Sequence, residues 1–146
     1  MSSKNKIIIE IDDREPDCQM LADVEGLNLE FKKKRLVIGD FVYKDLVVER
    51  KTVDDFCNSI LDGRLERQIN NMLKSDKQKI IIVIGKIEKR AVSMHEHCIL
   101  GKMISIIFKY KIPLIQVRTE KEFLWCLKNL CEKVNKKNKN DKIKTR

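Results

Sequence analysis

Two short runs of almost unbroken apolar residues constrain the fold of this chain more than any other feature. They lie at residues 6–11 (KIIIEI) and 79–84 (KIIIVI). Runs of this length that are rich in isoleucine and valine are typical of strands covered on both faces. Such strands occur where a sheet lies between two layers of helices. We therefore expect both runs to be buried strands of a layered α/β fold.

The segments around these runs alternate between strand-like and helix-like patterns. Residues 41–43 and 46–50 predict the two strands of a hairpin. In residues 53–61, apolar side chains recur at i, i+3 and i+4, a spacing that predicts a helix with Thr52 as its N-cap. The remaining expected strands are 27–31 and 112–117, and the expected helices are 17–25, 53–61, 65–73, 96–109 and 119–133. Strands that alternate with helices predict a largely parallel central sheet around an antiparallel hairpin.

The composition suits one domain followed by a basic tail. The chain has 146 residues, and 42% of them are hydrophobic, which is enough to bury a core. Its 31 Lys and Arg against 22 Asp and Glu give a net charge of +9, which favours a polyanionic partner. Residues 134–146 hold six of these cations against one acid. We expect residues 1–133 to form the domain and residues 134–146 to be a disordered tail that aids solubility or non-specific nucleic-acid binding.

Several classes of protein do not fit this sequence. There is no apolar run of about 18 residues that would span a membrane, and residues 1–6 lack the apolar stretch of a secretory signal. The five cysteines are scattered and odd in number, a pattern typical of reduced thiols in an intracellular protein. No Gly-rich phosphate loop is present, so ATP-driven helicase action is not encoded here. We expect an intracellular location, nuclear in a eukaryote and cytoplasmic in a prokaryote.

Acidic residues and one lysine lie where the predicted strands begin or end. Asp12 follows the first strand, Asp40 precedes the hairpin, and Glu49 ends the second hairpin strand. Side chains at i and i+2 of a strand share a face, so Glu49 and Lys51 should project together. Carboxylates are ligands that Mg²⁺ prefers, and a neighbouring lysine would stabilise charge on a phosphate. The set predicts metal-dependent hydrolysis of phosphodiester bonds, whereas each acid taken singly reads more simply as a solvated loop residue.

These residues belong to an extended motif that resembles the GDx(8)ERKxxxD signature of the XPF/Hef nuclease family. The motif residues are Gly39, Asp40, Glu49, Arg50, Lys51 and Asp55. The resemblance continues in a D-x-R-E segment at residues 12–15 and a G-R-L-x-x-Q segment at residues 63–68, and it covers about residues 6–133. The family is a branch of the restriction-endonuclease-like fold. The resemblance therefore implies a three-layer α/β fold with a central mixed sheet flanked by helices.

The resemblance implies cleavage of DNA beside a flap, fork, bubble or junction in repair or recombination, with magnesium or manganese as cofactor. The positions that match catalytic residues are Asp12, Glu15, Asp40, Glu49, Arg50, Lys51 and Asp55, and the implied metal ligands are Asp12, Asp40 and Glu49. By strand alternation, Arg50 should point to the opposite face and have a structural role. Arg14, Arg64 and Gln68 are expected to contact the DNA backbone or brace the site. For Arg64 and Gln68, a solvated helix face is the simpler alternative.

Nuclease domains of this family also pair through their later helices. The resemblance therefore implies a homodimer or heterodimer, with an accessory DNA-binding or clamp protein as a further partner. Residues 103–110 and 123–130 carry more apolar side chains than one core-facing stripe needs. Family enzymes usually carry a tandem helix-hairpin-helix domain after the nuclease domain, and nothing after Lys133 matches it.

Two other functions stay open for such a domain. One is a non-catalytic DNA-binding or scaffold subunit of a nuclease heterodimer, although subunits of that kind lose acids from the signature and this chain retains them all. The other is a junction-resolving or defence nuclease on the same fold.

Overall fold

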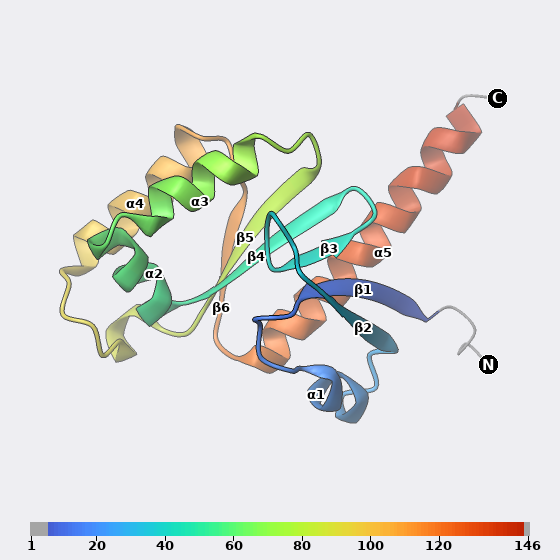
Figure 1. Cartoon of the computed structure of the whole chain (residues 1–146), viewed down its shortest axis with the longest axis horizontal. Coiled ribbons are helices and arrows are strands. Elements are labelled where there is room, and N and C mark those ends of the chain that lie inside the picture. The colour runs from blue at the N-terminus through green and yellow to red at the C-terminus, as the bar shows by residue number, and fades with distance from the viewer. Residues whose placement is uncertain (1–5, 145–146) are drawn as a thin grey trace.

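The computed structural model describes residues 6–144, and their side chains as far as residue 141. A mixed sheet lies between helices on both faces (Figure 1). The strands are β1 (Ile7–Asp12), β2 (Leu29–Lys34), β3 (Phe41–Tyr43), β4 (Leu46–Thr52), β5 (Gln78–Ile84) and β6 (Leu114–Val117). The helices are α1 (Gln19–Val24), α2 (Val53–Leu61), α3 (Arg64–Leu73), α4 (Glu96–Phe108) and α5 (Glu120–Lys144), with a short 3₁₀ helix at Ile87–Lys89. Within this described part of the chain, no helix combines the length and the apolar character that crossing a membrane requires.

The strands are arranged in the order β2-β1-β3-β4-β5-β6. The pairs β1/β2, β4/β5 and β5/β6 are parallel, whereas β3 pairs antiparallel with both β1 and β4. This topology confirms the predicted mixed sheet around an antiparallel hairpin. Because β3 runs against β1, the start of β3 lies beside the end of β1, where Ile11 pairs with Phe41. The residues that follow β1 and precede β3 are thereby brought to the same end of the sheet.

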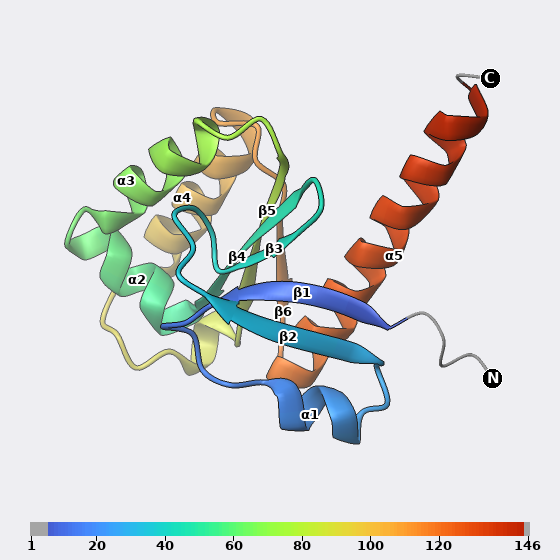
Figure 2. The same cartoon turned by 45° about the vertical axis from the view of Figure 1, so that its right-hand side comes forward.

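Two hydrophobic clusters lie on opposite faces of the sheet and give the fold its three layers. On one face, α1 and α5 lie against the sheet (Figure 2). Side chains of β1, β3, β4 and β5 pack against these two helices. On the other face, β4 and β5 pack against α2, α3 and α4. Side chains alternate along a strand, so Val48 of β4 faces α5 whereas Val47 faces the other helices. The side chains of residues 49 and 51 therefore point to the same face as that of Val47, toward α2, α3 and α4.

The two isoleucine-rich runs are covered to different extents. All residues Ile80–Ile84 of β5 are buried, as predicted for a strand between two helical layers. In β1, Ile7, Ile9 and Ile11 are buried, but Ile8 is 45% exposed. The prediction that β1 is covered on both faces is therefore wrong. The cluster under α2, α3 and α4 contains no residue of β1, so those helices leave that face of β1 open.

The last helix extends well past its predicted end at Lys133. Residues 134–144 are helical in the structure, where the sequence predicted a disordered tail, and the division into a domain and a tail stays a prediction. Cys131 and Val134 are buried against the sheet, which carries the apolar stripe of α5 past the predicted end. Residues 135–144 contain no glycine or proline, and lysine favours helices. The ends of the predicted domain and tail, residues 1–5 and 145–146, lie outside the described residues.

Candidate active site

The turn before β3 requires glycine and places the aspartate that follows. Gly39 has a φ of +76°, a conformation that favours glycine. A Cβ at this position would lie 2.3 Å from Val47 Cγ1, so space also excludes other residues. The amide of Asp40 donates to Val48 O at 2.9 Å, and Asp40 O accepts from the amide of Asp12 at 2.9 Å. The backbone of Asp40 therefore bridges β4 and the end of β1.

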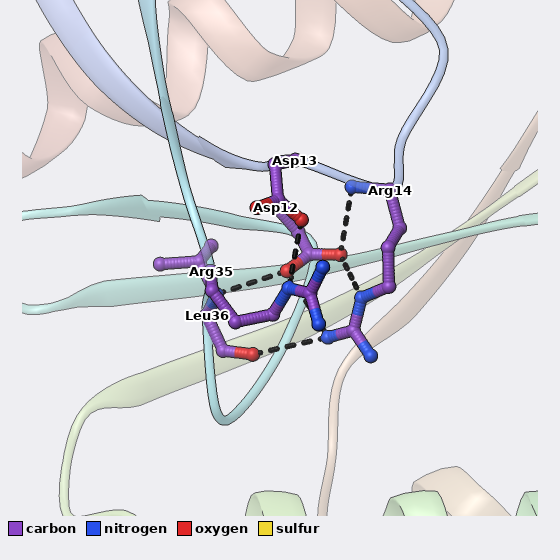
Figure 3. Close-up of polar contacts among 5 residues, drawn as sticks. All are labelled: Asp12, Asp13, Arg14, Arg35 and Leu36. Carbon is purple, nitrogen blue, oxygen red and sulfur yellow. Dashed lines mark hydrogen bonds and ion pairs between the residues drawn. The ribbon is translucent and has the colours of Figure 1, made fainter.

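The carboxylate of Asp12 is held by groups of its own turn and of the segment after β2 (Figure 3). Its Oδ1 accepts from the amide of Leu36 at 2.9 Å and from Arg14 Nη2 at 3.1 Å, and its Oδ2 accepts from Arg14 Nε at 2.8 Å. Arg14 Nη2 also donates to Leu36 O at 3.2 Å. The bonds from Arg14 lower the pKa of Asp12 to about 2, against the opposing effect of burial. Asp12 is thus a fixed anion with partners for both oxygens.

Glu49 and Lys51 project together from the face of β4 that turns toward α2, α3 and α4, as their spacing predicts. Glu49 is 7% exposed and Lys51 is 4% exposed, and Lys51 Nζ lies 3.6 Å from Glu49 Oε2. Burial and the charge of Asp40 raise the pKa of Glu49 to about 8, although Lys51 opposes the shift. Burial likewise raises the pKa of Asp40, although the amide of Arg50 donates to its Oδ2 at 2.8 Å. Buried carboxylates that repel one another would be stabilised in their charged form by a cation bound between them.

Arg50 leaves β4 on the α5 side and pairs there with two glutamates, which confirms its predicted orientation. Its Nε donates to Glu120 Oε1 at 3.0 Å, its Nη2 contacts Glu120 Oε2, and its Nη1 lies 3.7 Å from Glu15 Oε1. Since the amide of Arg50 also supports Asp40, this residue braces the site from behind. Glu120 was not predicted. A glutamate in the first turn of a helix looks like ordinary compensation of the helix dipole, and only the fold reveals its partner.

Glu15 lies among the other charges of the site. Burial and the charge of Asp40 raise its pKa to about 7, although Arg50 lowers it. Glu15 Oε1 is buried without a hydrogen-bond partner. Asp55 adds to the negative charge around Glu15. The first turn of α2 holds Asp55, whose amide donates to the Thr52 cap at 3.1 Å, as the predicted N-cap requires.

A cavity of about 390 Å³ brings most of the predicted site together. Seven of the ten predicted residues line it, namely Asp12, Arg14, Glu15, Asp40, Glu49, Arg64 and Gln68. The other three, Arg50, Lys51 and Asp55, act on these residues through the contacts and charges described above. Asn71 and Met72 of α3 also line the cavity and were not predicted, because their spacing on the helix resembles that of any partly buried face.

The helix α3 contributes one cation and one amide to this cavity. Arg64 Nε donates to Asp62 Oδ2 at 2.7 Å, and the Arg64 side chain is 46% exposed. Gln68 Oε1 is buried without a hydrogen-bond partner. An unpaired buried acceptor is costly, and it needs a donor rather than the oxygens of a phosphate, which are themselves acceptors. Gln68 Oε1 can accept from a hydrated group, whereas its Nε2 can donate to a phosphate, so both predicted roles of Gln68, bracing the site and contact with the DNA backbone, stay predictions.

Two of the three predicted metal ligands, Asp40 and Glu49, have the chemistry that a divalent cation requires. Across the residues that the structure describes, no three His, Cys, Asp or Glu side chains are placed to hold one ion. Both oxygens of Asp12 accept hydrogen bonds, from Arg14 and from the amide of Leu36, and a carboxylate bonded in this way keeps lone pairs for a cation. The predicted metal role of Asp12 therefore stays a prediction. Mg²⁺ keeps several waters and is often bound by one or two carboxylates. Asp40 and Glu49, whose pKa values are raised by burial, fit that role.

Comparison with known proteins gives a family model and curated relatives. Residues 11–130 match the model of the ERCC4 domain. A candidate ATP-dependent RNA helicase of Methanocaldococcus jannaschii is 37% identical over 138 residues, which make up 93% of this chain and 17% of that protein. The 3′-flap repair endonuclease Xpf of Saccharolobus solfataricus is 30% identical over 129 residues, which make up 87% of this chain and 55% of that protein. The chain thus spans about half or less of the length of these relatives.

Solved structures show the same fold. XPF from Aeropyrum pernix matches with a TM-score of 0.76 and 28% identity, over 86% of this chain and 60% of that one. The same protein in complex with DNA matches with a TM-score of 0.78 and 27% identity, over 89% of this chain and 66% of that one. The predicted restriction-endonuclease-like α/β fold is confirmed.

Proposed function

We propose that this chain is a divalent-metal-dependent endonuclease that cuts DNA beside a branch. The chain belongs to the ERCC4-domain family of XPF-type nucleases. The observation that carries this proposal is the cavity that gathers seven of the ten predicted residues, with Asp40 and Glu49 as buried, mutually repelling acids. The relatives support it, since one is named a 3′-flap repair endonuclease and another was solved in complex with DNA. All the acids of the signature are present, which disfavours a scaffold subunit.

The residues of the chain divide the chemical work among them. Asp40 and Glu49 would hold a magnesium or manganese ion, which when bound polarises a phosphoryl oxygen and lowers the pKa of a bound water. Lys51 places a buried positive charge beside Glu49, where it would stabilise negative charge that develops on the phosphate. Asp12 fixes Arg14 and the segment after β2, and Arg50 fixes Asp40 and Glu15. The predicted catalytic roles of Glu15 and Asp55 are to support this charge pattern.

Two arginines at the cavity are suited to hold the phosphate backbone. The side chains of Arg14 and Arg64 are 62% and 46% exposed, and both line the cavity that contains the acids. Contacts of this kind position nucleic acid without reading its sequence. They suit an enzyme that selects DNA by its shape.

Pairing with a second copy or a related subunit would cover an apolar surface on α4 and β6. This apolar surface consists of Leu100, Ile104, Ile107 and Phe108 of α4 and Ile115 of the edge strand β6. The exposed Trp125 of α5 lies apart from it, beside Leu27. Phe108 is 75% exposed and Ile104 is 63% exposed. Contiguous exposed apolar side chains mark interaction surfaces. The intracellular location and a clamp or accessory DNA-binding partner remain predictions.

Cleavage assays with labelled flaps, forks, four-way junctions and linear duplexes test the proposed function. With Mg²⁺ or Mn²⁺ we expect cuts near the branch, weaker cutting of linear duplex, and none after chelation. Asp40→Asn should abolish cutting with an unchanged circular dichroism spectrum. Asp45→Asn, in the exposed hairpin turn, is the matched control and should cut like the wild type. Cutting that survives chelation or Asp40→Asn would contradict the proposal.

A further inference from the structure

A second hollow lies away from the acids, where β4 and β5 begin. It has a volume of about 500 Å³ and lies between the sheet and the second half of α5. Leu46, Ile80, Leu130 and Val134 give it an apolar floor. Five lysines surround this floor, and no acidic residue lines the hollow; they are Lys77, Lys79, Lys111, Lys133 and Lys137. We call this hollow the lysine groove.

Local contacts position several lysines of the groove. Lys77 Nζ donates to Lys44 O at 2.8 Å, and Lys79 Nζ donates to Lys77 O at 2.8 Å. Lys111 Nζ lies 4.8 Å from the centre of the Phe108 ring. Between residues 6 and 141, no acidic side chain forms a salt bridge with any of the five. Cations that converge without counter-charges favour the binding of an anion.

The positive charge continues around α5 and forms a track. Lys133 also lines a neighbouring hollow, together with Lys136, Lys139 and one acid, Glu132. These lysines are exposed on a helix whose second half projects beyond the ends of the strands (Figure 2). Lysine acts as a point charge that contacts phosphates without reading sequence. A track that crosses two hollows fits a polymer of phosphates better than one small anion.

The groove lies on a different side of the sheet from the acids. Leu46 and Ile80 face α5, whereas Glu49 projects toward α3. Leu46 and Glu49 are also three residues apart, which is about 10 Å along a strand. Duplex DNA is stiff, with a persistence length of about 150 bp. One straight duplex seated at the acids therefore does not curve around to the groove, whereas a second arm of a branched molecule would reach it.

We infer that the lysine groove binds the phosphate backbone of a second arm of the nucleic acid whose first arm lies at the acids. The inference rests on the proposed function, from which it takes the DNA substrate, and adds the surface that holds the uncut arm. It also assigns a role to α5 beyond residue 133. Helix formation there places Lys133 and Lys137 one turn apart, opposite Lys79 of β5 and Lys77, which precedes that strand.

Binding without cleavage tests this inference. Fluorescence anisotropy in the presence of chelator would compare a fork and a linear duplex of equal length on the full chain. The groove variant carries Lys111→Gln, Lys133→Gln and Lys137→Gln. The control variant carries Lys32→Gln, Lys86→Gln and Lys89→Gln, which are exposed and line none of the hollows described. Both variants lose three positive charges, so a difference between them reports position rather than net charge.

The groove variant should bind the fork at least tenfold more weakly than the control variant does. The plot of its log K against log salt concentration should become less steep by about 2–3, because each phosphate contact contributes about 0.9 to the slope. The affinity for linear duplex should change equally in the two variants. Equal effects of the two variants on the fork would overturn the inference, as would equal losses for fork and duplex or displacement of the fork by millimolar inorganic phosphate. If the wild type binds the fork but does not cut it, that result contradicts the proposed function but does not contradict the inference about the lysine groove.

Discussion

Asp12 and Asp40 are joined through their backbones, yet their carboxylates lie in opposite electrostatic environments. The amide of Asp12 donates to Asp40 O at 2.9 Å. Arg14 holds the pKa of Asp12 at about 2, whereas burial raises the pKa of Asp40. One carboxylate is thus committed to the structure of the site. The other is available for a ligand.

Loss of the guanidinium should release Asp12. In Arg14→Met, Asp12 keeps the amide of Leu36 but loses the bonds that most lower its pKa. The pKa of Asp12, measured by carboxyl NMR, should rise from about 2 toward its ordinary value. A lowered carboxyl pKa stabilises the folded state above the ordinary value and loses that effect as the pH falls toward 2. The variant should therefore lose stability near neutral pH and match the wild type at the acid end. Arg35→Met, which removes the partner of Asp13, is the control and should leave the pKa of Asp12 unchanged.

Glu49 should make the protein less stable at alkaline pH. Its pKa in the folded state is about 8, above the ordinary 4.5. Its contribution to stability is complete below pH 4.5 and is lost as the pH rises toward 8. Glu49→Gln removes this loss, so at pH 8 and without divalent ions the variant should be more stable than the wild type by about 1–3 kcal/mol. The gain in denaturant unfolding should shrink toward pH 5. Glu88→Gln, at an exposed position, should show no such trend.

Divalent ions should stabilise the folded protein through Asp40 and Glu49. A ligand at 100 times its dissociation constant adds about 2.7 kcal/mol to the free energy of unfolding. Thermal unfolding of the wild type should therefore shift upward with Mg²⁺ or Mn²⁺ and return after chelation. Asp40→Asn should abolish most of the shift. An equal shift in that variant would place the ion elsewhere.

Gly39→Ala should destabilise the protein through both its backbone and its surroundings. The positive φ costs about 1 kcal/mol, and the overlap with Val47 adds roughly 1–3 kcal/mol of overpacking. Gly26→Ala is a matched control, since Gly26 has a φ of +66° but no atom within 4 Å of the added Cβ. Urea unfolding should show the smaller, backbone cost alone at Gly26. Similar losses at both positions would show that Val47 relaxes away.

Substitution of the apolar surface on α4 should change assembly without changing the fold. Phe108→Glu places a charge where a second subunit would pack. Sedimentation velocity should show a smaller species than the wild type at the same concentration. Met20→Glu on α1, where Met20 is 79% exposed, should sediment like the wild type. A wild type that is already monomeric at high concentration would contradict pairing through this surface.

The features that sequence revealed depend on local periodicity and on the spacing of charged residues. Alternation in β4 placed Glu49 and Lys51 together and turned Arg50 away, and the hairpin and the Thr52 cap follow the same short-range rules. These relationships need only a strand or one helical turn to be correct. The extended motif then joined this segment to Asp12.

The features that sequence missed depend on contacts between distant segments. Asp12 accepts from the amide of Leu36, 24 residues away, a bond that no local pattern reveals. Arg50 pairs with Glu120, 70 residues away. The exposure of Ile8 depends on which strands the helices cover. The lysine groove combines β5, the segment before β6 and the part of α5 that was predicted to be disordered.

The most direct test of the central claim is anomalous diffraction from crystals of the protein soaked in Mn²⁺. The account predicts one peak in the cavity, bonded to carboxylate oxygens of Asp40 and Glu49, while Asp12 remains paired with Arg14. Loss of the peak in Asp40→Asn would confirm the assignment. A peak elsewhere, or none at concentrations that support cleavage, would contradict it.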